Sequence, residues 1–161
     1  MTVRENLYAA APDQPGEHLV NLFIRKGKVQ AREREIRAQT EDLIDFLRMR
    51  KVADVPAGLL SGGQKKLLEL GTVTMLKPKI LLDEPFARVN AILIGQLMDR
   101  IRVLHRQGVG FLIIEHDLDA LSDLVDEMHV LDNGMLLASG SPQAVLTDPR
   151  VREAYLGGFV Q

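Results

Sequence analysis

The chain has no cysteine among its 161 residues, which excludes a disulfide framework and any thiolate metal site. It has no apolar run near the roughly 20 residues that cross a bilayer. Residues 1–5 show no signal-peptide core. The net charge is only −2, so composition does not indicate nucleic acid or an anionic membrane as a partner. With 46% hydrophobic and 26% charged residues, the chain has the composition of an ordinary globular domain with a core.

A serine followed by two glycines, Ser61, Gly62 and Gly63, precedes a segment of good helix-forming residues from Gln64 to Leu76. This order predicts a tight turn that leads into a helix N-terminus. Such a turn offers backbone N–H groups, a hydroxyl and the positive end of a helix dipole, worth roughly half a charge. That combination suits an anion such as a phosphate. The alternative is an ordinary serine N-cap, which these three residues taken alone favour.

Two adjacent carboxylates, Asp83 and Glu84, follow the short apolar run 80–82 and precede Pro85. The run is consistent with a strand buried on both faces. Open α/β sheets bind ligands at the C-terminal ends of their strands, where neighbouring side chains point in different directions and can have different roles. The alternative is an ordinary acidic strand end followed by a turn.

A histidine, His116, follows the apolar run 111–114 and is flanked by Glu115 and Asp117. A histidine in a loop is more often a solvated surface residue, although an imidazole at this place can also act near pH 7. No His, Asp and Glu set has the spacing of a tightly held zinc site. The histidine therefore needs its context to be interpreted.

The first half of the chain reads as helical. Thr2 and Glu5 form a capping-box pattern that predicts a short helix to Ala10. Another short helix is expected over 18–24, and a longer, highly charged one should end near Arg50. The charged run is either a docking surface or a solvated helix face with local ion pairs, and the pattern alone favours the second.

The second half predicts a parallel α/β arrangement, since strand and helix alternate over residues 79–125. Further elements are two strands around an Asn-Gly turn and two helices that begin with a cap residue and a proline. The predicted ranges are helices 92–106 and 118–125, strands 128–131 and 135–138, and the caps Ser141 and Asp148. We expect three parts: a helical subdomain at 1–76, an α/β core at 77–140 and a helical tail at 141–161.

Taken together, the three motifs resemble the ABC-transporter ATPase family. Residues 60–66 resemble its signature motif, residues 80–85 its Walker B strand with the catalytic glutamate, and residues 113–117 its switch-histidine segment. Residues 2–6 resemble the segment after its glutamine loop. The resemblance implies a P-loop NTPase fold of which this chain carries the helical subdomain and the C-terminal part of the parallel-sheet core.

The resemblance also implies site residues, with ATP and Mg²⁺ as cofactors. Ser61, Gly62, Gly63 and Gln64 would contact ATP held by a second subunit. Asp83 would hold Mg²⁺ through water, and Glu84 would act as the base on the attacking water. His116 would contact the γ-phosphate.

Two positions, Arg88 and Lys79, depart from the family pattern. Asn90 lies in the D-loop region and would help contact ATP. In the same region, Arg88 stands where relatives often have glycine. Because an arginine adopts positive φ only at a cost, communication between subunits through this loop is expected to suffer. Lys79 also makes the Walker B strand one apolar residue shorter.

Residues 140–158 resemble the tail of branched-chain amino acid transporter subunits. The expected partners are a second ATPase subunit, two transmembrane permeases and an external solute-binding protein, with no nucleic acid. The expected location is the cytoplasmic face of the inner membrane, as a peripheral subunit. The alternative interpretation of the tail is a pair of capped surface helices.

The P-loop pattern Gly-x-x-x-x-Gly-Lys-Ser/Thr occurs nowhere in the chain, whose one Gly-Lys pair is Gly27-Lys28. We therefore expect a truncated ATPase subunit that does not hydrolyse ATP alone, with an exposed sheet edge and apolar surface. The alternative is an interaction module that supplies only the signature face to an intact subunit. A chromosome-structure ATPase is disfavoured because no sustained heptad run appears.

Overall fold

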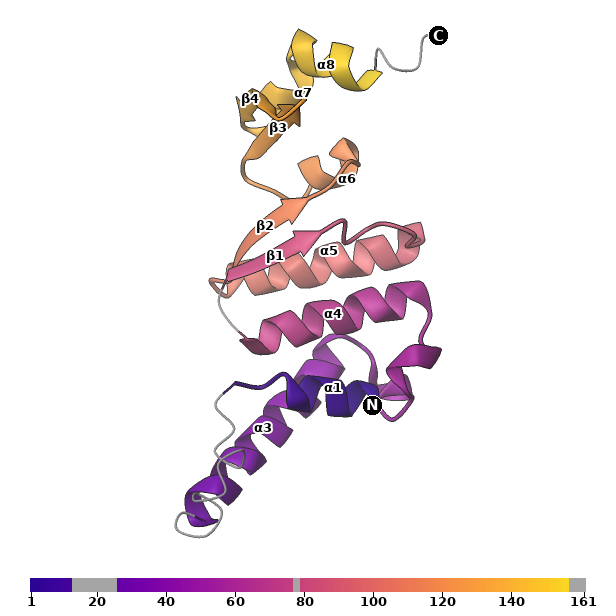
Figure 1. The fold of residues 1–161 in the computed structure, drawn as a ribbon, viewed down its shortest axis with the longest axis vertical. Helices are drawn as coiled ribbons and strands as arrows, with labels where there is room; N and C mark the ends of the chain where they lie inside the picture. The colour runs from indigo at the N-terminus through magenta and orange to yellow at the C-terminus, as the bar shows by residue number, and fades with distance from the viewer. Residues whose placement is uncertain (13–25, 77–78, 157–161) are drawn as a thin grey trace. The chain divides into compact units, whose positions relative to one another are not determined.

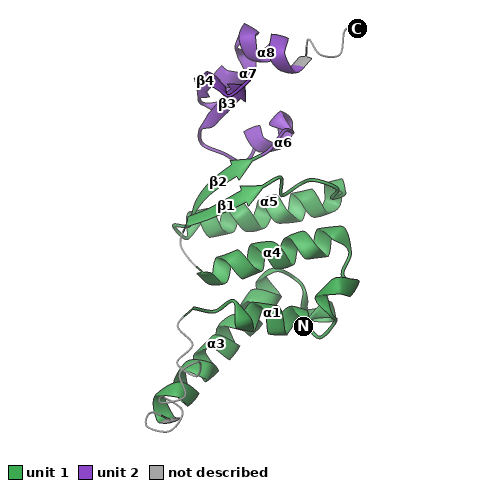
Figure 2. Ribbon diagram, viewed as in Figure 1, with its two compact units in different colours: residues 1–114 green, residues 115–161 purple. Residues whose placement is uncertain are grey.

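The computed structural model describes residues 1–12, 26–76 and 79–156. The chain divides into two compact units, residues 1–114 and residues 115–161 (Figure 2). Each unit is described by itself below. The three-part division expected from the sequence stays a prediction, and the helix expected over 18–24 lies outside the described residues.

The first helix, α1 (Val3–Ala9), is labelled in Figure 1 and begins with the predicted capping box. The Thr2 hydroxyl accepts a hydrogen bond from the Glu5 amide at 3.2 Å, and the Glu5 carboxylate accepts one from the Thr2 amide at 2.8 Å. Two donors that a helix start leaves without partners are thereby satisfied. The segment before α1 also pairs with a later strand-like segment, through an antiparallel bridge between Thr2 and Pro56.

The long charged helix, α3 (Lys26–Phe46), ends four residues before the predicted boundary. Arg48 adopts φ 55°, the left-handed conformation that closes a Schellman motif. Its amide donates to the Asp45 carbonyl, and the Met49 amide donates to the Ile44 carbonyl, both at 2.9 Å. The prediction of an end near Arg50 was wrong because this conformation usually requires glycine, and the sequence shows none there.

Two short 3-10 helices, η2 (Arg50–Val52) and η3 (Ala57–Leu59), lead to α4 (Gly62–Leu76). The core of the helical part is formed by side chains from α1, α3 and α4. Its members include Val3, Leu7, Ile36, Ile44, Leu47 and Leu70, all at most 2% exposed. Burying one such side chain contributes about 1.5–3 kcal/mol, so these contacts hold the three helices together.

The first unit ends in a β-α-β arrangement of β1 (Lys79–Asp83), α5 (Ala91–Arg106) and β2 (Gly110–Ile114). The two strands pair in parallel, as predicted, with Ile80 opposite Phe111 and Asp83 opposite Ile114. The expectation of a strand buried on both faces was wrong for this unit. Ile80 is 4% exposed, but its neighbour Leu81 is 60% exposed, since side chains alternate between the faces of a strand.

The second unit contains α6 (Leu118–Ser122), the strands β3 (Met128–Asp132) and β4 (Met135–Gly140), and the helices α7 (Pro142–Thr147) and α8 (Pro149–Leu156). The predicted hairpin is confirmed: Asn133 and Gly134 form its turn, with φ of 47° and 79°. Helix α6 ends at Ser122 rather than near Val125, and beyond it the Leu124 and Val125 amides both donate to the Leu121 carbonyl in one further turn. Within the described residues, no helix is both long and apolar enough to span a bilayer.

Candidate functional site

The serine-glycine turn is a capped helix start. The Ser61 hydroxyl accepts from the Gln64 amide at 3.3 Å, and the Gln64 side chain accepts from the Ser61 amide at 3.0 Å. The ordinary N-cap reading of this serine is thus what the structure shows. It leaves room for a second role, because a hydroxyl that accepts one hydrogen bond still carries a proton to donate. Helix geometry also leaves the Gly62 and Gly63 amides without intrahelical acceptors.

The two glycines of this turn differ in their surroundings. Gly63 is buried, and a Cβ atom built on it would collide with Cδ1 of Leu93 in α5. Gly62 is exposed, and a Cβ atom there would lie 3.6 Å from the Arg88 carbonyl oxygen, an ordinary contact. Gly63 is therefore required by the packing of α4 against α5. Sequence reasoning missed Leu93, since nothing local marks it as a neighbour of Gly63.

The two carboxylates lie at the C-terminal end of β1, where the sequence placed them. Asp83 is the last strand residue, and the Glu84 amide extends the ladder by donating to the Ile114 carbonyl at 2.9 Å. Both residues are exposed. Glu84 has φ 45°, and its carbonyl accepts from the Ala87 amide at 3.2 Å, so it begins a tight turn. A non-glycine residue in this conformation costs about 1–3 kcal/mol and is found most often at functional sites.

A magnesium ion fits this strand end only as part of a larger site. Among the described residues, no three His, Cys, Asp or Glu side chains form a group that would hold a metal. Mg²⁺ does not need such a cage, since it keeps several waters and binds through one or two carboxylates together with phosphates. The exposed Asp83 carboxylate meets that requirement.

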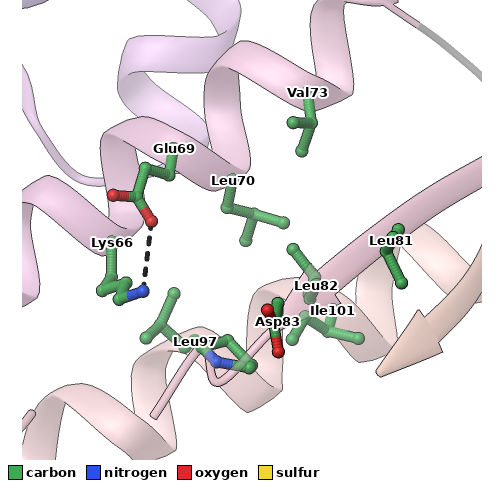
Figure 3. A pocket seen from close by; sticks show the side chains of 10 residues that line it. Lys66, Glu69, Leu70, Val73, Leu81, Leu82, Asp83, Leu97 and Ile101 are labelled. Atoms are coloured by element: carbon green, nitrogen blue, oxygen red, sulfur yellow. Dashed lines mark ion pairs between the residues drawn. The ribbon is translucent and has the colours of Figure 1, made fainter. Parts of the chain in front are cut away.

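A groove of about 220 Å³ opens between α4, β1 and α5, with Asp83 on its wall (Figure 3). Its lining is mostly apolar and includes Leu70, Leu82 and Ile101. Its one cation, Lys66, lies 3.3 Å from the Glu69 carboxylate, and Figure 3 marks this ion pair. An apolar groove whose lysine is already paired does not suit a triphosphate.

The loop after Glu84 adopts the conformation that its sequence seemed to disfavour. Arg88 has φ 59°, the conformation that an arginine adopts only at a cost, and the effect on communication between subunits stays a prediction. Asn90 follows as the N-cap of α5, with its side chain accepting from the Leu93 amide at 3.0 Å. The role that the structure gives Asn90 is therefore to start this helix, and its contact with ATP stays a prediction.

The histidine belongs to the second unit, whereas Asp83 and Glu84 belong to the first. The His116 side chain is 72% exposed, and its Nδ1 lies 3.6 Å from a Glu115 carboxylate oxygen. The His116 amide donates to the same oxygen at 3.2 Å, and the Glu115 side chain is only 1% exposed. Glu115 thus fixes the backbone of a residue whose imidazole faces solvent.

Comparison with known proteins agrees with these features. A family model described as ABC transporter matches residues 1–87, and one described as branched-chain amino acid ATP-binding cassette transporter matches residues 135–160. A probable branched-chain amino acid transport ATP-binding protein, LivG, from Archaeoglobus fulgidus is 39% identical over 98% of this chain and 60% of its own. The corresponding protein of Methanocaldococcus jannaschii is 38% identical over 98% of this chain and 62% of its own.

Solved structures give the same result. A nucleotide-free ATP-binding cassette from an ABC transporter superposes with a TM-score of 0.76 at 36% identity, covering 96% of this chain and 62% of its own. An ATP-binding cassette in its ADP conformation gives 0.71 at 32% identity, covering 98% and 63%. The chain thus spans about 60% of the length of the curated relatives named here. Because the ABC transporter match covers more than half of the chain and the fold agrees, the chain belongs to the ABC transporter ATP-binding family and is related to its branched-chain amino acid transport subunits.

Proposed function

We propose that the protein is the ATP-hydrolysing subunit of an ABC importer for branched-chain amino acids. The observation that carries the choice of solute is the match of residues 135–160 to the branched-chain amino acid model. The capped turn at Ser61 and the carboxylates at the end of β1 support the choice of activity. Bound ATP would supply the phosphoryl group that is transferred to water.

Each site residue has a role that its geometry allows. Ser61 would donate its hydroxyl proton to a phosphate oxygen, together with the Gly62 and Gly63 amides at the α4 N-terminus. Asp83 would hold Mg²⁺ through water. Glu84, on its turn, would orient and deprotonate the attacking water.

Three further residues complete the proposed site. His116 is exposed on its loop and would donate a hydrogen bond to the γ-phosphate. Gln64 and Asn90 would contact ATP while they cap α4 and α5.

The proposed site is shared between two subunits. The P-loop pattern occurs nowhere in the 161 residues, so the phosphate cradle would come from a segment outside this sequence or from another chain. We expect a second ATPase subunit, two permeases and a solute-binding protein as partners, with this subunit at the cytoplasmic face of the inner membrane.

The experiment that tests this proposal joins residues 1–161 to the P-loop-bearing N-terminal part of a full-length relative. The chimera should hydrolyse ATP, and Glu84→Gln should lower its rate by about 10²–10⁴-fold, as for loss of a general base. Glu153→Gln, at an exposed carboxylate in α8, is the matched control and should leave the rate unchanged. Equal rates for Glu84→Gln and the unmodified chimera would refute the role of Glu84.

The absence of the P-loop pattern favours a second candidate function. The chain as it stands would then supply the signature face to an intact subunit. Mixing it with a P-loop-bearing subunit whose own signature serine is replaced by arginine should restore ATP hydrolysis. Ser61→Arg in this chain should abolish the restored activity, and a mixture that stays inactive with the unmodified chain would contradict this candidate.

A further inference from the structure

Among the glycines that the structure describes, Gly63 is the one on which an added Cβ atom would come closest to another element, at Leu93 of α5. A Cβ atom on Gly63 would collide with Cδ1 of Leu93 and would lie 3.2 Å from its Cγ and 3.3 Å from its Cβ. All three distances are shorter than those that real Cβ atoms usually keep from other atoms. The Leu93 side chain therefore packs directly against the backbone of residues 61–64, which we call the signature turn.

Leu93 is itself held in place. It lies in the first turn of α5, and its amide donates to the Asn90 side chain at 3.0 Å. The next amide, of Ile94, donates to the Asn90 carbonyl at 3.0 Å. Because the cap fixes the backbone of this turn, the Leu93 side chain is presented at a defined position.

The loop before α5 also lies close to the same turn. The Arg88 carbonyl oxygen lies 3.6 Å from the position of a Cβ atom on Gly62, and Arg88 has φ 59°. The turn thus packs against α5 at Gly63 and lies near the loop before α5 at Gly62. Both the loop and α5 lie within the first unit.

We propose that Leu93 is a positioning residue that sets where the α4 N-terminus presents Ser61 and the two glycine amides. It links the signature turn to the loop of Arg88 and Asn90, so that the two segments move as one piece. This inference rests on the proposed function only for its consequence, the contact with ATP. The packing itself is independent of ATP.

The first test measures the packing in the full chain. Amide hydrogen exchange reports local opening of the Ser61–Gln64 turn, and thermal unfolding reports stability. Leu93→Ala should speed exchange of the hydrogen-bonded Ser61 and Gln64 amides by about tenfold, because it removes the apolar contact that holds the turn. Gly63→Ala should lower the melting temperature, because its Cβ atom has no space beside Leu93.

The decisive comparison is the double variant. In the Leu93→Ala background Cδ1 and Cγ are gone and only the Cβ atom remains, 3.3 Å away, so Gly63→Ala should lower the melting temperature much less than it does beside leucine. Gly95→Ala in α5 is the matched control, since a Cβ atom there meets nothing within 4 Å. If Gly63→Ala lowers the melting temperature equally in both backgrounds, the proposal is wrong.

The second test measures ATP hydrolysis in the mixture with a P-loop-bearing subunit that lacks its own signature serine. Leu93→Ala should lower the restored rate by about a hundredfold, as expected when a binding group is displaced by about 1 Å. Leu93→Met, of similar volume, should recover most of it, and Gly95→Ala should have no effect. An unchanged rate for Leu93→Ala would overturn the positioning role, whereas an inactive mixture with the unmodified chain would refute the signature-face function and leave the exchange result to decide on Leu93.

Discussion

Several residues adopt the left-handed backbone conformation without being glycine: Arg48, Glu84, Arg88 and Asn133. Arg48 and Glu84 follow α3 and β1, Arg88 lies in the loop before α5, and Asn133 lies in the hairpin turn. Three of the four have no side chain suited to the conformation, which only asparagine and aspartate adopt with relative ease. At Arg48 the conformation closes α3, and at Glu84 it begins the turn after β1. The strain at Glu84 lies at the proposed catalytic carboxylate, whereas the strain at Arg48 has only a structural purpose.

Arg48→Gly should therefore stabilise the protein, by about 0.5–1 kcal/mol. Glycine adopts the conformation at C′ of the Schellman motif without a Cβ penalty, and this outweighs its greater freedom in the unfolded chain. Arg37→Gly, at an exposed position inside α3, is the matched control and should cost about 1 kcal/mol. Urea unfolding of the two variants should shift the midpoint in opposite directions, and a shift of both to lower urea would contradict this account of Arg48.

The Ser61 hydroxyl combines a structural and a proposed functional role, and substitutions should separate them. Ser61→Ala removes the cap and should lower stability by about 1 kcal/mol, while Ser61→Asp keeps a good N-cap. The aspartate should nevertheless abolish restored ATP hydrolysis, because its charge repels phosphate. Thermal unfolding and ATPase rates of the two variants check this, and an active Ser61→Asp variant would contradict phosphate contact at this turn.

At the scale of elements, local patterns were the ones that the sequence could predict. The capping box at Thr2, the hairpin turn at Asn133-Gly134 and the parallel pairing of β1 with β2 each depend on residues close together or on hydrophobic period. The end of α3 and the one-sided burial of β1 were mispredicted. The first depends on a rare conformation of Arg48 and the second on which elements cover the sheet.

In the candidate site, too, features set by local sequence were predictable and features set by tertiary contacts were not. The turn at Ser61 and the carboxylates after β1 could be placed from spacing alone, and the structure has them at the predicted ends of α4 and β1. Leu93 could not be found, because its contact with Gly63 is tertiary and 30 residues separate the two in the sequence (93 − 63). The sequence placed Gly63 in the turn before the helix, so nothing local indicated a close neighbour from α5.

The helical elements are also joined by a network of exposed ion pairs. Arg4 of α1 pairs with Asp54 at 2.9 Å and with Glu41 of α3, and Arg50 pairs with Glu41 and, at 2.5 Å, with Asp45. Hydrogen bonds from Arg4 lower the pKa of Asp54, and hydrogen bonds from Arg50 lower the pKa of Asp45. A carboxylate with a lowered folded pKa contributes stability above its unfolded pKa, and that stability is lost as the pH falls through the folded value.

Acid should therefore weaken the helical part below about pH 4, the ordinary pKa of aspartate. At pH 7, Asp54→Asn should have a lower melting temperature than the unmodified protein. Between about pH 5 and 3, around the same pKa, its melting temperature should fall less than that of the unmodified protein. Asp42→Asn, at an exposed α3 carboxylate outside this network, should behave like the unmodified protein. Parallel melting curves for Asp54→Asn and the unmodified protein across this range would contradict the network's role.

At the scale of the whole molecule, an apolar sheet face is open to solvent. Leu81, Leu112 and Ile114 are each more than half exposed on the two-stranded sheet of the first unit. The sequence led to the expectation of exposed apolar surface, and such a patch favours association. Replacing the three residues by threonine should lower ANS fluorescence and light scattering while the far-ultraviolet circular dichroism stays the same.

The control for this surface is Ile80→Thr, whose side chain is buried against the other face of the same strand. It should unfold or strongly destabilise the first unit, since it places a hydroxyl in the core. If the triple threonine variant binds ANS and scatters light as strongly as the unmodified chain, the sheet face is not the source of association.

The most direct test of the central claim is a titration of Mg-ATP into the purified 161-residue chain. The chain carries the proposed signature turn and the proposed Walker B carboxylates but no P-loop pattern, so it should hold only part of an ATP site. The account predicts no saturable 1:1 binding by calorimetry, and binding only when a P-loop-bearing subunit is added. Saturable 1:1 binding with micromolar affinity to the chain alone would contradict it.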